Sequence, residues 1–383
     1  MIFINLFEIC ISINEKSKIM KSTIHEYQKN NKLNVSKIFK TLVAFAILSI
    51  SCSKDNDEPQ VQTEIPKKVI DVYLAGQEYT GTNYIGKYWK NGTPTILNSN
   101  TTYSTQLSDM AVSGTDVCIS GEEYNSVSKS YYYWKNGIPT ALPITGTFGA
   151  TTTGIAVSGN DVYVSGHQFI TGNDQKAVYW KNGNQISLTT GAGYSFTNDI
   201  ALSGQNVCVI GGTQTANNFF ISKLWIDGVP RTISNLDSRV SSIFVSGTNI
   251  YISGKEKSNL GVFAAKYWIL NTLTDVFTKV DLGTFGLSSA ESIFVSGTDV
   301  YVAGVERNAT GTDFAKYWKN GQATVLSDGT KDAYCASITV DGTDVYTCGA
   351  DGNIIKHWKN NVATNYTDGT KSAGGITVFA ITR

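Results

Sequence analysis

Carboxylates recur at one position of a repeat that runs through most of this 383-residue chain. The position lies two residues after a glycine that ends a predicted strand. Around a ring, such side chains would gather on one face and suit a cation, an amine or sugar hydroxyls. The alternative is internal pairing with a lysine that stands two residues before the tryptophan in five repeats, because four repeats carry both charges, and exposed pairs of this kind contribute only about 0–1 kcal/mol. The occupants are Glu78, Glu123, Gln168, Thr213, Glu256, Glu306 and Asp351.

Aromatic side chains follow this position directly in the first two repeats. Rings beside carboxylates suit carbohydrate stacking, although such rings can equally pack the bases of their loops. His167 stands at the same end of the third repeat. The candidate ligand-binding residues are therefore Glu78, Glu123, His167, Glu256, Glu306, Tyr79 and Tyr124.

Catalytic motifs are missing from the sequence. Only His25, His167 and His357 occur, and they form no Ser/His/Asp arrangement and no cluster with metal-ligand spacing. Neither a phosphate-binding glycine loop nor an Asp-x-Asp-x-Asp-Gly calcium loop is present. We expect no catalytic residue, no metal and no cofactor. Paired carboxylates can in principle hydrolyse glycosides, so a hydrolase or lyase stays open as the alternative.

Two short sequence features recur with nearly the same period through seven repeats, and they indicate the strands that position these side chains. We call them the two landmarks of the repeat. One is an Asp-Val-Tyr-like triplet, as at 161–163, and the other is a tryptophan about 18 residues later. A period in the mid-forties built of short strands is typical of propeller blades. We predict an all-β, seven-bladed β-propeller of four-stranded blades with a tryptophan in each third strand. These tryptophans are Trp89, Trp134, Trp180, Trp225, Trp268, Trp318 and Trp358.

The third repeat shows the plan of one blade. Strands are expected at 154–158, 161–166, 177–180 and 185–188, with glycine and asparagine in the tight turns. The run Tyr179 to Gly183 resembles the kelch-type blade, and it is similar to the Tyr-Trp-x-Asn-Gly repeats of bacterial extracellular propeller proteins. The resemblance implies a blade and no particular activity.

The ends of the repeat region indicate how the ring closes. The first repeat begins with a second strand at 69–73, and the C-terminal segment 375–380 resembles a first strand. We expect the C-terminal strand to complete the N-terminal blade, because this removes an exposed edge.

The N-terminal region has the layout of an export signal. Lysines precede the apolar run 42–48, and small residues lead to Cys52. The segment 48–52 resembles a bacterial lipobox, which implies lipid attachment at Cys52 and an outer-membrane, cell-surface location. The alternative is an ordinary cleaved signal peptide. We assign 1–51 to the signal peptide, with Met20 as an alternative start, 52–66 to an acidic tether and 67–383 to the propeller.

Composition narrows the class of partner. Lys and Arg together balance Asp and Glu at 31 each, which gives no case for nucleic acid. Cys118 and Cys208 are expected as buried apolar residues. Cys335 and Cys348 flank one hairpin diagonally, a poor geometry for a disulfide, so we do not expect a bridge.

The expected function is therefore recognition at the cell surface. Loops after the second and fourth strands vary between repeats, while the other turns repeat nearly the same residues. Variable loops on a rigid scaffold are where binding usually lies. We expect a monomeric module that binds a glycan or a protein through this face and touches the membrane only through its lipid.

We predict that Cys52 carries lipid. Metabolic labelling with a palmitate analogue should mark the wild-type protein and fail to mark Cys52→Ala, because the modified thiol is the attachment point. Equal labelling of the variant would exclude Cys52.

Overall fold

The computed structural model describes residues 71–97, 102–144, 148–171, 174–283, 286–366 and, for the backbone, 376–382. All described strands belong to the unit that runs from Lys68 to Arg383. The segments that the sequence assigns to a signal peptide and a tether, with Cys52, lie outside the described residues. Within the described part of the chain, no helix is long and apolar enough to cross a membrane.

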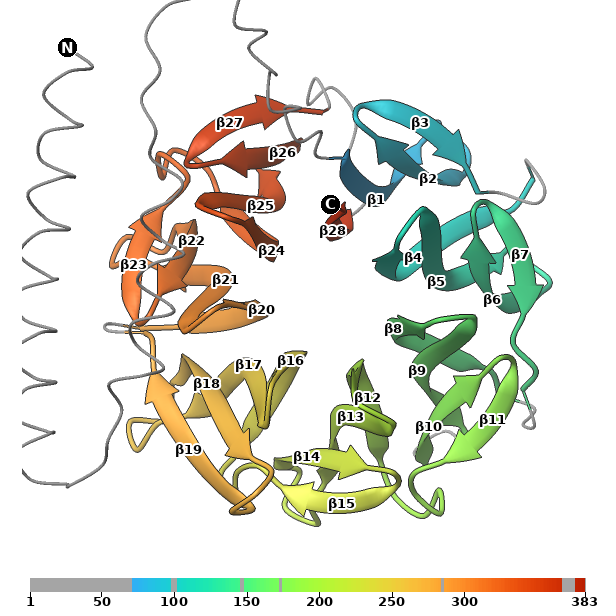
Figure 1. The fold of residues 1–383 in the computed structure, drawn as a ribbon, viewed down its shortest axis with the longest axis horizontal. Helices are drawn as coiled ribbons and strands as arrows, with labels where there is room; N and C mark the ends of the chain where they lie inside the picture. Colours follow the sequence, from blue (N-terminus) through green and yellow to red (C-terminus); the bar gives the residue numbers. More distant parts are fainter. Residues whose placement is uncertain are drawn as a thin grey trace, which may run out of the picture. The chain divides into compact units, whose positions relative to one another are not determined.

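The strands form seven antiparallel sheets of four strands each, arranged as the blades of a β-propeller (Figure 1). This confirms the predicted fold class. Blade 1 consists of β28, β1, β2 and β3, and blades 2 to 7 follow in chain order from β4–β7 to β24–β27.

The first strand of each blade lies nearest the axis, and neighbouring first strands contact one another around the ring (Figure 1). The first strands are β28 (Ile376–Thr382), β4 (Ser104–Ser113), β8 (Ala150–Ser158), β12 (Ser195–Ser203), β16 (Ser238–Ser246), β20 (Ser288–Ser296) and β24 (Ala333–Asp341). The second strands are β1 (Asp71–Tyr79), β5 (Asp116–Tyr124), β9 (Asp161–Phe169), β13 (Asn206–Gln214), β17 (Asn249–Lys257), β21 (Asp299–Arg307) and β25 (Asp344–Asp351).

The third and fourth strands complete each blade toward the rim. The third strands are β2 (Tyr84–Lys90), β6 (Lys129–Lys135), β10 (Gln175–Lys181), β14 (Phe220–Ile226), β18 (Phe263–Asn271), β22 (Asp313–Lys319) and β26 (Ile354–Lys359). The fourth strands are β3 (Thr93–Ile96), β7 (Ile138–Ala141), β11 (Asn184–Ser187), β15 (Val229–Thr232), β19 (Val276–Asp281), β23 (Gln322–Val325) and β27 (Val362–Asn365).

The tryptophans lie in the third strands, as predicted, and each packs against the preceding blade. Trp180 of blade 3 shares a buried cluster with Tyr131 and Leu142 of blade 2. Trp89 of blade 1 packs in the same way against a cluster that contains Tyr346 of blade 7. The other six tryptophans are at most 2% exposed. The core is therefore a ring of seven clusters between blades.

A glycine in the second strand lets the backbone of the first strand approach closely, and in blade 3 it also leaves room for the tryptophan ring. A Cβ atom at Gly166 would stand 2.3 Å from the carbonyl oxygen of Thr151 and 2.7 Å from the Trp180 ring. Any larger residue would overpack this contact. A side chain at this position of β9 is therefore excluded by the carbonyl of Thr151 and by the Trp180 ring.

The Asp-Val-Tyr-like triplet of the repeat binds the turn that directly follows the tryptophan, which explains why the two landmarks recur with nearly the same period. In blade 3, Asn182 donates from Nδ2 to Asp161 at 2.7 Å, and its Oδ1 accepts from the backbone N–H of Val162 at 2.8 Å. Lys181 forms an ion pair with Asp161 at 2.9 Å and lies over the Tyr163 ring. Asn182 adopts a φ of 50°, which asparagine tolerates in tight turns. We call this arrangement the Asp–Asn clasp, and blades 1, 2, 6 and 7 repeat it.

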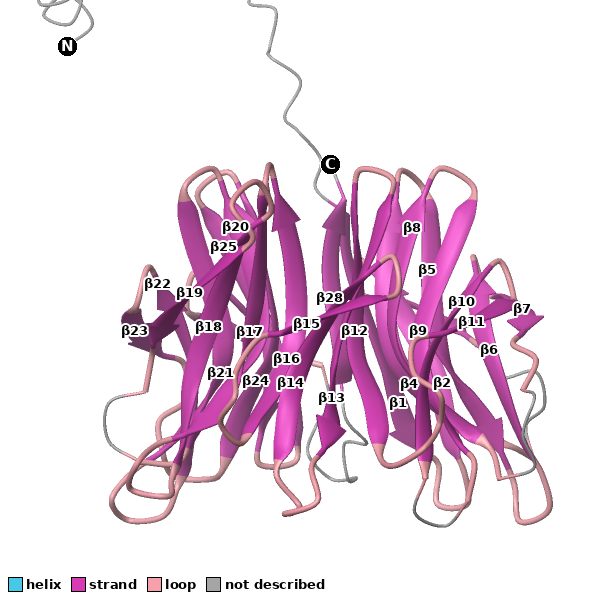
Figure 2. Ribbon diagram, turned by 90° about the horizontal axis from the view of Figure 1, so that it is seen from below, coloured by secondary structure: helices cyan, strands magenta, loops and turns pink. Residues whose placement is uncertain are grey.

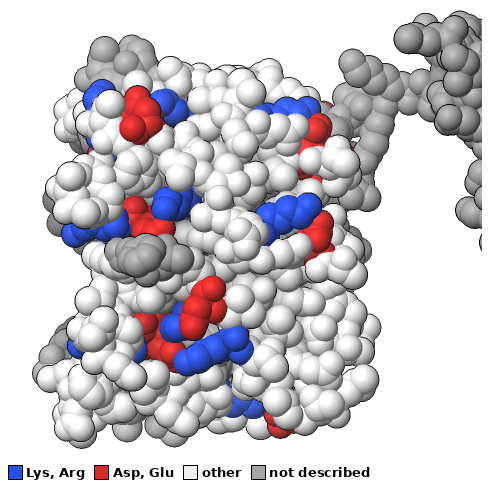
Figure 3. Space-filling model, turned by 90° about the vertical axis from the view of Figure 1, so that its left-hand side faces the viewer, with Lys and Arg blue, Asp and Glu red and all other residues white. Residues whose placement is uncertain are grey.

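The clasps and short turns occupy one end of the strands, and the longer loops occupy the other (Figure 2). We call the second end the variable-loop face. It holds the connections from second to third strands and from fourth to first strands. On the rim, basic and acidic side chains lie side by side on a mostly uncharged surface (Figure 3). Most of these charged side chains form ion pairs with one another.

The four described cysteines are buried free thiols, so Cys335 and Cys348 form no bridge. Burial raises the pKa of Cys335 to about 12. Cys118 and Cys208 are fully buried, as expected for apolar core positions.

The C-terminal strand closes the ring, as predicted. Strand β28 pairs antiparallel with β1, with Thr382 opposite Asp71 and Phe379 opposite Leu74. It also contacts the first strands of both neighbouring blades, β4 and β24. One strand therefore completes a sheet and two interfaces between blades.

Ending the chain after residue 374 should destabilise the whole propeller, because β1, β4 and β24 all lose a neighbour. We expect the melting temperature to fall by about 5 °C or more. Circular dichroism on heating measures this, with a chain lacking only Arg383 as the control. An unchanged melting temperature would refute the role of β28 in closure.

Candidate functional site

The recurrent carboxylates pair with lysines of their own blades. This confirms the pairing alternative in the four blades that carry both charges. The ion pairs are Glu78–Lys87, Glu256–Lys266, Glu306–Lys316 and Asp351–Lys356. The carboxylates therefore form separate pairs around the ring and not one cluster.

Several of these carboxylates are buried, which corrects the expectation that they are exposed. The side chain of Glu256 is 4% exposed, and it also accepts from Lys279 at 2.7 Å and from the Ser234 hydroxyl. Glu306 and Glu123 are buried as well. Only Glu78 keeps a largely accessible side chain, at 42%. The reason is geometric, since the ends of the second strands still lie between neighbouring blades.

His167 and the candidate tyrosines make local contacts. The His167 ring meets Phe169 edge-on at 5.6 Å, and burial lowers the pKa of His167 to about 4. Tyr79 packs on Tyr84 and donates to the carbonyl of Gly81 at 2.9 Å. Tyr124 lies under Lys129. These rings pack the bases of their loops, which was the alternative to carbohydrate stacking.

A cavity on the propeller axis offers a different site. Each described first strand of blades 2 to 7 carries a bulge at the same height, where the register with the second strand shifts. The bulged segments line a polar cavity of about 170 Å³. Its walls include Ser108, Asp109, Thr153, Asn198, Asp199, Ser241, Ser242, Glu291, Ser292, Ala336 and Ser337.

The two aspartates of this cavity bind backbone of neighbouring blades. Asp109 accepts from the N–H of Met110 and of Ile155, both at 2.8 Å. Asp199 accepts from the N–H of Ile200 at 2.7 Å and of Ile243 at 3.0 Å. Burial raises the pKa of both, that of Asp199 to about 6. Because both oxygens of each carboxylate serve the backbone, these aspartates connect blades.

The outer part of the cavity opens toward the variable-loop face. A hollow of about 360 Å³ shares Asn198, Ser241 and Glu291 with the axial cavity and adds Val305 and Tyr334. Tyr334 stands near the start of β24, and Val305 stands near the end of β21, so both mark this face. We call the combined space the axial pocket.

Two acceptors of the axial pocket have no partner within the described part of the chain. The Oδ1 atom of Asn198 is buried without a hydrogen bond. The half-buried carboxylate of Glu291 makes no hydrogen bond or ion pair with the described residues. Buried polar groups normally find partners. A ligand that offers hydroxyl or amine donors would satisfy both.

The pocket residues lie on the first strands, whereas the repeat pattern of the sequence is clearest in the second and third strands and in the turns. A first-strand comparison carries the signal. Five of the six described bulges hold a polar residue directly before a second small or acidic residue, namely Ser108, Thr153, Asn198, Ser241 and Glu291. Among the described residues, no group of three or more His, Cys, Asp or Glu side chains could hold a metal ion.

Comparisons with known proteins support the fold alone. No protein family matches the chain, and no curated protein matches its sequence. A puromycin-hydrolyzing peptidase of Mycobacterium tuberculosis superimposes with a TM-score of 0.51 at 12% identity, over 77% of this chain and 53% of that one. A puromycin hydrolase mutant superimposes with a TM-score of 0.54 at 9% identity, over 78% and 52%. The chain thus spans about half the length of these two structures. The Dos1 propeller superimposes with a TM-score of 0.47 at 16% identity, over 80% of this chain and 83% of that one.

The paired carboxylates should differ in their contribution to stability. Glu256→Gln should lower the free energy of unfolding by about 2–4 kcal/mol, because it removes the buried carboxylate that pairs with Lys279, while Lys266 keeps its ion pair with Asp281. Glu78→Gln, at the same repeat position but more exposed, should cost at most about 1 kcal/mol. Urea denaturation measures both. Equal, small effects would show that the Glu256 pairs contribute no more than surface charges.

Proposed function

We propose that this chain is an exported, monomeric cell-surface module that binds a glycan in its axial pocket without cleaving it. The observation that carries the proposal is the pair of unsatisfied acceptors, Asn198 Oδ1 and the Glu291 carboxylate, in one polar cavity. Sugar hydroxyls are donors that such acceptors bind. Tyr334, 38% exposed at the opening, offers a ring against which a sugar can pack.

The same contacts argue against glycoside hydrolysis in this pocket. That chemistry normally uses two carboxyl groups in separate roles. Asp109 and Asp199 are committed to backbone donors, which leaves Glu291 as the uncommitted carboxylate among the described pocket residues. A hydrolase or lyase remains the alternative, and product analysis separates the two.

Export and anchoring belong to the same proposal. They rest on the leader and on Cys52, which lie outside the described residues, and the labelling experiment above tests them.

A glycan array should identify ligands of the wild-type protein. Against a ligand so found, Glu291→Gln should weaken binding about tenfold or more, because a hydrogen bond to a charged group is worth about 1.5–3 kcal/mol. Asn198→Ala should weaken binding about two- to tenfold, because a hydrogen bond between neutral groups is worth about 0.5–1.5 kcal/mol. Titration calorimetry measures this.

Glu78→Gln is the matched control, since it makes the same change in the ring of recurrent carboxylates, and it should leave binding unchanged. Loss of binding in Glu78→Gln with unchanged binding in the two pocket variants would move the site to the rim. Mass spectrometry of the incubated glycan completes the test, because shortened products would favour the hydrolase or lyase.

A further inference from the structure

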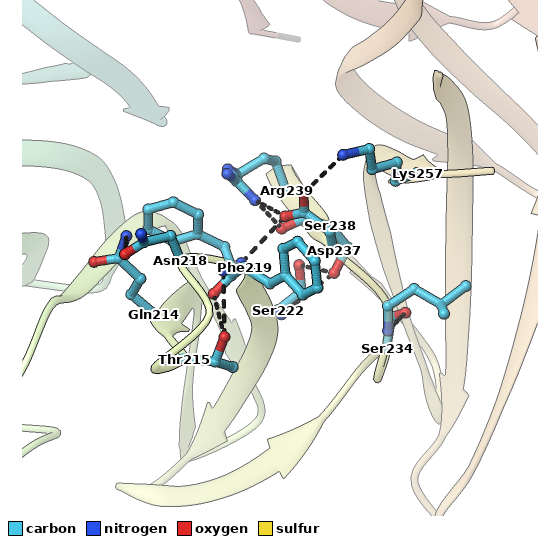
Figure 4. A network of polar contacts seen from close by, with 12 residues as sticks. Gln214, Thr215, Asn218, Phe219, Ser222, Ser234, Asp237, Ser238, Arg239 and Lys257 are labelled. Atoms are coloured by element: carbon cyan, nitrogen blue, oxygen red, sulfur yellow. Dashed lines mark hydrogen bonds and ion pairs between the residues drawn. The ribbon is translucent and has the colours of Figure 1, made fainter. Parts of the chain in front are cut away.

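A basic, aromatic cluster lies on the variable-loop face between blades 4 and 5 (Figure 4). Tyr194, Phe196 and Phe220 contact one another edge-on, with ring centroids 5.4–6.1 Å apart. The guanidinium carbon of Arg239 stands 3.7 Å from the centre of the Phe220 ring. Phe219, the next residue along the chain, is 48% exposed.

Arg239 is held in place by one edge only. Its Nη1 donates to Asp237 at 2.7 Å and to the carbonyl of Ser238 at 3.0 Å. Asp237 is itself fixed, because it accepts from the backbone N–H of Phe220 at 3.1 Å. The Nε and Nη2 atoms of Arg239 have no acceptor among the described residues. A planar guanidinium with a free edge is prepared to bind a carboxylate through two parallel hydrogen bonds.

The cluster carries an excess of positive charge. Lys255 and Lys257 stand about 6 Å from the centre of the Phe263 ring, as does Arg239. Lys257 also lies 4.0 Å from Asp237, and both Lys257 and Arg239 point toward this carboxylate (Figure 4). Lys255 forms no ion pair with the described residues, so three cations and one carboxylate give the cluster a net charge of +2. Elsewhere on the propeller, lysines are mostly matched one to one, so an anionic group is attracted to this place.

The cluster adjoins the axial pocket. Phe196 and Asn198 lie two residues apart on β12, and Arg239 and Ser241 lie two residues apart on β16. Two residues along a strand span roughly 7 Å. Asn198 and Ser241 line the axial pocket. A chain of sugars that enters the pocket therefore comes within reach of Arg239.

We infer that the ligand is an anionic glycan whose uronate carboxylate binds the free edge of Arg239. The apolar face of the same or a neighbouring sugar packs on Phe219, and Lys255 and Lys257 add attraction for the charged chain. This inference rests on the proposed glycan-binding function. An acidic peptide shares the charge, but the pocket acceptors Asn198 and Glu291 favour a partner rich in hydroxyl donors.

The test compares acids with their esters. Oligosaccharides of polygalacturonate, alginate and hyaluronan are each paired with their methyl esters, which keep the sugar and remove the charge. Neutral glucan, sulfated dextran and poly-glutamate complete the panel. The full chain should bind at least one uronate at least tenfold more tightly than its ester, and high salt should reduce the difference.

Variants assign the effect to Arg239. Arg239→Ala should abolish the preference for acid over ester, and Arg239→Lys should keep only part of it, because lysine retains charge but loses the two-pronged geometry. Arg231→Ala is the matched control, since Arg231 pairs with Asp275 at 2.8 Å outside the cluster. That variant should keep the preference. Melting temperatures confirm that each variant is folded.

The outcomes separate the two proposals. Equal binding of acid and ester, binding of neutral glucan alone, or an equal loss in Arg239→Ala and Arg231→Ala would overturn the inference and leave glycan binding standing. Tighter binding of poly-glutamate or of sulfated dextran than of any uronate would also overturn it. Failure to bind any glycan, acidic or neutral, would overturn the proposed function itself.

Discussion

The packing of each tryptophan against the blade before it is the contact on which the rest of this structure depends. A four-stranded blade has two faces to bury, and neither is covered within the blade. Trp180 covers blade 2 from blade 3, and Trp89 covers blade 7 from blade 1. Because the contact is directional, the seven blades are stable only as a closed ring. Strand β28 makes that closure with backbone hydrogen bonds to β1.

Closure of the ring also creates the axial pocket. The first strands converge on the axis, and their bulges turn polar residues toward one another at the same height. Asp109 and Asp199 then bind backbone of the next blade, which fixes the spacing of the wall. The pocket is thus a consequence of packing between blades, with residues contributed by six described first strands.

The sequence predicted what repeats and could not predict what depends on the assembled ring. Blade number, the place of Trp180 and its counterparts, closure by β28 and the four ion pairs all follow from residues that recur at fixed spacing. The contacts of the buried Glu256 do not, because they include Lys279, and the position of Lys279 opposite the tryptophan holds proline, glutamine or alanine in the other blades. The pocket residues could not be predicted from the sequence for a related reason. A bulge inserts one residue into a strand, so Asn198 and Glu291 fall outside the alternation that identifies strand faces.

The two faces of the propeller differ in how completely they use their polar groups. On the face of the short turns, the clasp of Asp161, Lys181 and Asn182 leaves each group partnered, and four other blades repeat it. On the variable-loop face, Asn198 Oδ1, the Glu291 carboxylate and one edge of Arg239 are left without partners among the described residues. A buried acceptor without a partner is costly unless something binds there. The open edge of Arg239 lies beside an exposed ring and is available to an anion. An acidic sugar needs acceptors for its hydroxyl groups and donors for its carboxylate, and this face offers both side by side. The polar groups that have no partner among the described residues therefore indicate the chemistry of the ligand.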